Sequence, residues 1–110
     1  MTPDEVLGSF EEQVMLAVIR TAGEAYGMSV RRELERVTER DVTVGAVYAT
    51  LDRLEAKRLV SSARSGYDDG SRRLFSVTAA GARALAETRA LRERLWKGVD
   101  LSPLLAARRA

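Results

Sequence analysis

Few side chains in this sequence could do covalent or acid–base chemistry. None of its 110 residues is a cysteine or a histidine, which excludes disulfides, thiol nucleophiles, the usual zinc sites and histidine general bases. The 16 acidic residues are scattered among arginines and lysines, and no pair of them is typical of a catalytic site. The composition therefore predicts no enzyme, no metal site and no cofactor. An enzyme built on a carboxylate or lysine cluster is the alternative.

The basic side chains remain as groups that could bind a charged partner. There are 18 lysines and arginines against 16 acids, a net charge of +2. Such a small excess indicates nothing about nucleic acid by itself, because what matters is where the basic residues lie. The placement of these residues depends on the helices and strands that carry them.

Apolar residues recur at three- and four-residue spacings along the first half of the chain, which predicts three short helices. The expected helices span about residues 4–22, 27–38 and 44–57. Gly23 would close the first helix, and Thr43 would cap the third. The side chains expected in the three buried stripes are Phe10, Val14, Ala17 and Val18, then Val30, Leu34 and Val37, then Val44, Val47, Leu51 and Leu54.

The pattern then changes to two short strands and a long helix. Residues 59–64 and 72–77 read as strands on either side of the turn-rich segment 65–71, which predicts a β-hairpin. Thr78 would cap a helix over residues 79–97, and Ser102-Pro103 would begin a short one. Three helices followed by a hairpin predict a mainly α (α+β) fold, a winged helix-turn-helix with a long C-terminal helix.

The motifs in this frame resemble the PadR family of transcriptional regulators over about residues 6–99. The segments that carry the resemblance are Leu7 to Glu11, Ala25 to Val30, Val44 to Leu54, Leu59-Val60, Arg72 to Phe75 and Thr78 to Gly81. The short length is similar to the subfamily with a single C-terminal helix. The resemblance implies a DNA-binding domain over residues 1–77, a dimerisation helix over 78–99 and a tail over 100–110.

Two departures from the family pattern affect these expectations. Family members often have glycine directly after the third helix, where this chain has Arg58. Left-handed backbone would cost a non-glycine residue about 1 kcal/mol, so a different helix end is expected here. Asp68 and Asp69 stand at the hairpin tip, where they would weaken contacts with phosphate.

The third helix is the predicted reader of the DNA major groove, because a groove about 12 Å wide admits one helix. The residues left on its outer arc are Thr43, Gly45, Ala46, Tyr48, Ala49 and Arg53. The small residues would let its backbone approach DNA, and Tyr48 and Arg53 would reach phosphates or bases. In the alternative, Tyr48 half-packs on the core and Arg53 is a solvated charge paired with Glu39 or Glu55.

Two further sets are candidate DNA contacts: Arg64, Arg72 and Arg73 beside the hairpin tip, and Tyr26, Gly27 and Ser29 at the start of the second helix. The arginines could follow the phosphates or enter the minor groove, or they could protect an exposed strand edge from aggregation. The free N–H groups of the second helix suit a phosphate. Alternatively, Tyr26 is a core residue and Ser29 an ordinary first-turn residue.

The last helix carries the candidate dimer contacts. Its apolar side chains fall in one arc of roughly 140°. The expected interface residues, with one from the first helix, are Phe10, Leu85, Leu91, Leu95, Trp96 and Val99. Ligand-responsive family members bind planar aromatic compounds near the dimer interface, so the resemblance makes Trp96 a candidate effector site. The alternative is that Trp96 only anchors the interface.

The sequence thus predicts a homodimer that binds double-stranded DNA at a pseudo-palindromic operator and represses transcription, with response to a small aromatic effector as a further expectation. A winged helix that docks on other proteins and has no DNA target is the alternative. The chain has no secretory signal, and its longest nearly uncharged apolar run, Val14 to Ile19, is too short to cross a membrane. A cytoplasmic bacterial protein, on the nucleoid when bound, is therefore expected.

Overall fold

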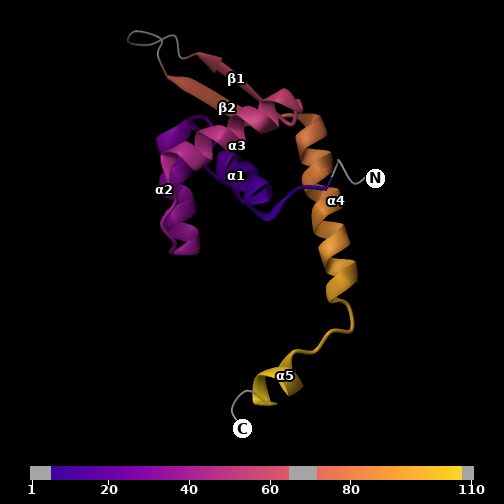
Figure 1. Ribbon diagram of the computed structural model, residues 1–110. Coiled ribbons are helices and arrows are strands. Elements are labelled where there is room, and N and C mark those ends of the chain that lie inside the picture. The colour runs from indigo at the N-terminus through magenta and orange to yellow at the C-terminus, as the bar shows by residue number, and fades with distance from the viewer. Residues whose placement is uncertain (1–5, 65–71, 108–110) are drawn as a thin grey trace.

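The computed structural model describes residues 6–64 and 72–107 of the chain. Its elements, in chain order, are α1 (Ser9–Arg20), α2 (Gly27–Thr38), α3 (Val44–Ala56), β1 (Val60–Arg64), β2 (Arg73–Val77), α4 (Ala79–Trp96) and α5 (Ser102–Ala107). Figure 1 shows the first three helices gathered beneath the hairpin, with α4 running down one side. The predicted winged helix-turn-helix with a long C-terminal helix is confirmed.

The core forms where the inward stripes of the first three helices meet the hairpin. Val14, Val30, Leu51 and Leu54 have no exposed surface, and Phe75 of β2 closes the core from the hairpin side. The prediction was wrong at Val37, whose side chain is 51% exposed. It lies on the same face as Val30, but at the last turn of α2, where it lines a surface groove between α1 and α2.

The first helix begins later than the sequence predicts. It starts at Ser9 rather than near Asp4, and residues 1–5 lie outside the described part of the chain. Leu7 is buried, and its N–H donates to the hydroxyl of Thr88 on α4. The N–H of Gly8 donates to the Glu11 carboxylate, 3.0 Å away, which satisfies one of the free donors at the helix start. The residues before Ser9 are thus held against α4 by the Leu7 bond, and α1 begins directly after them.

The turn between α2 and α3 is held by side chains of α2. Glu39 has left-handed backbone, with φ of 57°. The Arg31 Nε donates to the carbonyl of Val42, and the Val42 N–H donates to the Glu35 carboxylate, at 2.7 and 2.9 Å. The Thr43 hydroxyl accepts from the Ala46 N–H, which confirms the predicted N-cap. These contacts fix the direction in which α3 starts.

The end of α3 corrects an expectation. Arg58 adopts left-handed backbone, with φ of 63°, as a glycine would. Its N–H donates to the Glu55 carbonyl, and the Leu59 N–H donates to the Leu54 carbonyl, both at 2.9 Å. This pair of bonds is the Schellman arrangement that glycine usually closes. The helix therefore ends in the family manner despite the arginine.

The hairpin is antiparallel and tied to the helices at its base. Val60 pairs with Val77, Ser62 with Phe75 and Arg64 with Arg73. The Phe75 N–H donates to the Ala25 carbonyl between α1 and α2, 2.7 Å away. The hairpin tip, with Asp68 and Asp69, lies outside the described residues.

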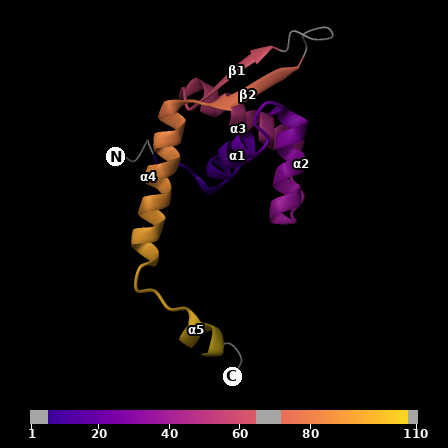
Figure 2. The same ribbon diagram turned by 180° about the vertical axis from the view of Figure 1, so that it is seen from behind.

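α4 packs on the rest of the chain from its start as far as Arg92, whose guanidinium pairs with Glu12 of α1. Thr78 caps it as predicted, and a Cβ at Gly81 would lie 2.0 Å from the Leu59 carbonyl oxygen, so α4 starts in close contact with the base of β1. Figures 1 and 2 both show the C-terminal end of α4, and α5 beyond it, standing clear of the other elements. Among the described residues, no helix is long and apolar enough to cross a membrane.

We predict that Arg58→Gly raises the free energy of unfolding by about 1 kcal/mol, because it relieves a left-handed arginine without removing a backbone bond. Chemical denaturation followed by circular dichroism measures this. Lys57→Gly, one residue earlier in right-handed backbone, is the control and should lower stability. An Arg58→Gly variant less stable than the parent would contradict the strain argument.

Candidate nucleic-acid interface

The outward face of α3 is the central feature of the candidate interface. Val47, Leu51 and Leu54 are completely buried and anchor the opposite side of the helix. The residues turned to solvent at the start of α3 are Thr43, Gly45, Ala46 and Ala49. The face is therefore smooth at its N-terminal end, where a recognition helix meets base edges.

Gly45 has no reason within the fold to be glycine. Its φ is not positive, and a Cβ added there would meet nothing within 4 Å. Glycine in a helix costs up to about 1 kcal/mol relative to alanine. The missing side chain therefore weakens α3 slightly and leaves its backbone open to close approach from outside.

Tyr48 and Gly27 belong to one contact between α3 and α2. A Cβ on Gly27 would lie 2.2 Å from the Tyr48 Cζ and 2.4 Å from its hydroxyl oxygen. The Tyr48 ring therefore lies directly over the first turn of α2, which only glycine allows. The ring is still 38% exposed, so Tyr48 half-packs and keeps surface on the outer face.

Arg53 is exposed and lies on the α1 side of α3. Its Nη2 donates to the Thr50 hydroxyl, 3.2 Å away. Within the described part of the chain, no carboxylate lies within ion-pair distance of its guanidinium, so neither Glu39 nor Glu55 pairs with it. Its charge remains available to an outside partner.

Arg73 connects the wing to α3. Its guanidinium lies 3.2 Å from Asp52 and 2.6 Å from Glu55, and 4.8 Å from the Phe75 ring centre. The Ser62 hydroxyl, with Arg73, lowers the pKa of Glu55, so the carboxylate is ionised in this pair. Arg73 is thus engaged within the protein and sets the position of β2 against α3.

Arg72 makes a different contact, with the start of α2. Its guanidinium lies 4.1 Å from the centre of the Tyr26 ring. Arg32 lies 5.9 Å from the same ring and donates to the Tyr26 hydroxyl at 2.9 Å. Two guanidinium groups thus gather around one phenol beside the hairpin, and Arg64 lies across the strands from Arg73 in register.

Ser29 is occupied by local bonds. Its hydroxyl accepts from the Tyr26 N–H at 2.9 Å and lies 2.6 Å from the Glu24 carbonyl. These bonds set the start of α2 beneath Tyr48. The predicted second-helix set therefore lies together at one corner, with Tyr26 half-buried and Gly27 buried.

Two residues of this region were missed in the sequence. Asp52 is exposed on α3 and pairs with Arg73, and Arg32 joins the Tyr26 cluster. Asp52 stands seven residues after Gly45 and three after Ala49, so helical spacing alone could have placed it on the outer face. The contact of Arg32 depends on its side-chain rotamer and on the position of the Tyr26 ring. The sequence shows only that the two residues are six positions apart.

The candidate dimer residues divide into two groups. Phe10 and Leu85 are half-buried against the core of their own chain, and Leu91 is half-buried. Leu95, Trp96 and Val99 are 70%, 56% and 51% exposed. The uncovered apolar surface is therefore at the end of α4 and just beyond it.

A three-helix domain with a wing and a smooth, open third helix defines a winged helix-turn-helix DNA-binding protein. Residues 15–87 match the model of the PadR-like family of transcriptional regulators. The transcriptional regulator Rv3488 of Mycobacterium tuberculosis is 40% identical over 76 residues, which are 69% of this chain and 70% of that protein. The chain belongs to the PadR-like family, which consists of DNA-binding transcriptional regulators and not of enzymes.

Solved structures agree with this assignment. A PadR-like transcription factor from Bacteroides fragilis has the same fold, with a TM-score of 0.69 at 24% identity over 80% of this chain and 84% of its own. A PadR family regulator from Eggerthella lenta gives a TM-score of 0.66 at 25% identity, covering 84% of this chain and 80% of its own.

We predict that Gly27→Ala destabilises the protein by about 1–3 kcal/mol, because its methyl group would overlap the Tyr48 ring. Tyr48→Ala in the same chain removes the overlap, so the double variant should be more stable than additivity allows. Urea denaturation of the two single variants and the double variant measures this coupling. Additive effects would mean that the ring does not constrain Gly27.

Proposed function

We propose that the protein is a homodimeric repressor that binds a pseudo-palindromic operator through α3 and the wing. The α3 helices of two subunits would enter successive major grooves, with half-sites about 10 bp apart or a multiple of that. The observation that carries the proposal is the open glycine-and-alanine face of α3, with Arg53 and the wing arginines beside it. The family assignment establishes DNA binding as the class of activity.

The arginines would divide the work on DNA. Arg72 and Arg64 are exposed beside the hairpin tip and would contact phosphates on one side of the DNA major groove. Arg53 would contact phosphates on the other side of this major groove. Such contacts position a protein on the duplex without reading sequence. Arg73 would act indirectly, because its ion pairs with Asp52 and Glu55 hold the wing.

The dimer would form through the second half of α4. The stripe that begins with the buried Gly81, Ala84 and Thr88 continues along the same face to the half-buried Leu91 and to Leu95, which is 70% exposed. Burying a large apolar side chain contributes about 1.5–3 kcal/mol. Pairing with a second α4 about a two-fold axis would bury this stripe on both subunits.

A planar aromatic effector would stack on Trp96 at this interface. The indole is more than half exposed and would line any space left between two paired helices. Such a ligand would act by favouring a dimer in which the α3 helices are wrongly spaced for the operator, to the extent that it binds that geometry better.

We predict that Gly45→Ala keeps or slightly raises the stability of the free protein but weakens operator binding by at least tenfold. The added methyl group improves helix propensity and obstructs close approach to DNA. The operator is first selected from a random pool, then fluorescence anisotropy gives the affinity and denaturation the stability. Gly8→Ala, where a Cβ would meet only Glu11 at 3.6 Å, is the matched control. Unchanged affinity of Gly45→Ala would remove α3 from the interface.

We predict that Leu95→Glu makes the protein monomeric at micromolar concentration, because it places a charge in the middle of the proposed interface. Ala90→Glu is the control, since Ala90 lies on the opposite side of α4 and should leave the dimer intact. Sedimentation equilibrium distinguishes these outcomes. A monomeric parent protein at high concentration would contradict the homodimer and the two-half-site operator together.

A further inference from the structure

The groove between α1 and α2 is an apolar surface on the side of the domain away from the wing. It encloses about 260 Å³ and is lined on its apolar sides by Leu16, Ala17, Ile19, Leu34 and Val37. Three of these side chains, Leu16, Ile19 and Val37, are exposed. Covering these side chains with a second apolar surface would remove them from water, which is favourable.

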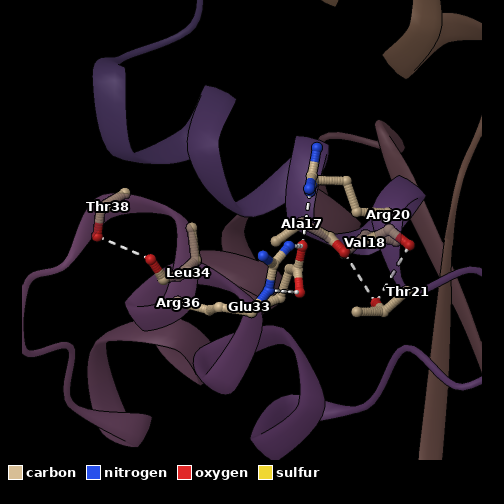
Figure 3. A network of polar contacts seen from close by, with 8 residues as sticks. All are labelled: Ala17, Val18, Arg20, Thr21, Glu33, Leu34, Arg36 and Thr38. Atoms are coloured by element: carbon tan, nitrogen blue, oxygen red, sulfur yellow. Dashed lines mark hydrogen bonds and ion pairs between the residues drawn. The ribbon is translucent and has the colours of Figure 1, made fainter.

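The charged rim of the groove is satisfied within the protein. Glu33 of α2 lies 2.6 Å from both Arg20 of α1 and Arg36 of its own helix, as Figure 3 shows. Hydrogen bonds from Arg36 and Arg20 lower the pKa of Glu33 to about 2. The ion pair between Glu33 and Arg20 holds α1 and α2 together at this end of the groove. A ligand would therefore be recognised by the apolar side chains of the groove.

The chain carries a matching apolar segment at its C-terminal end, the arm, which we define as residues 97–107. Leu101, Leu104 and Leu105 are exposed on it. Leu104 and Leu105 belong to α5, and Leu101 directly precedes this helix, with its carbonyl accepting the Leu105 N–H at 3.0 Å. The Asp100 carboxylate accepts the Ser102 N–H at 2.9 Å and starts this helix. A six-residue helix is too short to be stable alone in water, so α5 needs a surface to pack on.

That surface is not the groove of the same chain. Gly98 has φ of 80°, and this left-handed residue turns the chain at the end of α4. In both views of the structure the arm lies well away from α1 and α2 (Figures 1 and 2). The arm and the groove of one subunit are therefore both uncovered.

The surface area that a stable dimer needs indicates what covers the groove between α1 and α2. A stable interface needs about 800 Å² from each partner. Leu95, Trp96 and Val99 together would contribute less than about 500 Å², taking about 60–120 Å² for an aliphatic side chain and 150–250 Å² for an aromatic one. The three arm leucines and the three exposed groove residues are the remaining large apolar groups of comparable exposure apart from Val6 and Tyr48 in the described chain.

We propose that the arm of each subunit crosses the dimer and seats Leu101, Leu104 and Leu105 in the α1–α2 groove of the other subunit. The exposed apolar run from Leu95 to Leu105 is then one continuous contact, first with the partner's α4 and next with its DNA-binding domain. This inference rests on the proposed homodimer. It makes the arm a link between the dimer helix and the domain that carries α3.

The natural absence of cysteine allows a direct test. Differently tagged chains carrying Leu105→Cys and Val37→Cys are mixed, allowed to exchange subunits and treated with a short bismaleimide. A cross-linked heterodimer carrying both tags is expected. Leu105→Cys mixed with Ala49→Cys, on the outer face of α3, is the matched control and should give none. A heterodimer with the control pair but not with Val37→Cys would overturn the proposal.

Affinity provides the second measurement. Leu104→Ser with Leu105→Ser, and separately Ile19→Ser with Val37→Ser, should each weaken dimerisation by at least about tenfold in Kd, and the combination should weaken it little further. Dimers of unchanged affinity with no cross-link would overturn the arm contact and leave the α4 homodimer standing. A parent chain that is monomeric would overturn both. A single chain that carries both Leu105→Cys and Val37→Cys provides one more outcome. If it cross-links only within itself, the arm lies on the groove of its own subunit, which would also overturn the proposal.

Discussion

Burial of one side of α3 is the constraint on which the rest of the structure depends. Val47, Leu51 and Leu54 are withdrawn completely from water between α1, α2 and the hairpin. Because a helix has only one face to give to a core, the opposite face must be presented outward. That face carries Gly45, Ala46 and Ala49, which are exposed and do not contribute to the core.

Polar and aromatic contacts, in addition to the apolar core, position α2 and the wing against α3. Tyr48 lies over Gly27 and sets the start of α2, and Arg73 joins the wing to α3 through Asp52 and Glu55. Arg72, over the Tyr26 ring, joins the wing to α2. Most of these groups are partly exposed, so each contact is individually modest. Together they place the recognition surface as one unit, in which the wing, α2 and α3 support one another.

The C-terminal helix serves two surfaces with one apolar stripe. One face of its N-terminal part packs on the domain, with Gly81 close to the Leu59 carbonyl and the Thr88 hydroxyl accepting the Leu7 N–H. Its C-terminal end extends past the domain, where Leu95 and Trp96 are exposed. Any change in how two such helices pair would be transmitted to the domain through a rigid element, and this is the physical basis for the proposed response to an effector.

The sequence by itself determined the elements, their order and the outward face of α3. Caps at Thr43 and Thr78, the apolar spacing and the change to a hairpin are local signals, and local signals survive folding because they involve residues a few positions apart. Only the tertiary structure decided that Arg58 takes left-handed backbone, that Val37 borders a groove and that Gly27 serves Tyr48. Each of these outcomes depends on segments distant in sequence: the hydroxyl of Thr78 bonds the Arg58 carbonyl, and Tyr48 reaches Gly27 from the next helix. Periodicity shows which way a side chain points, but packing between elements decides what it meets.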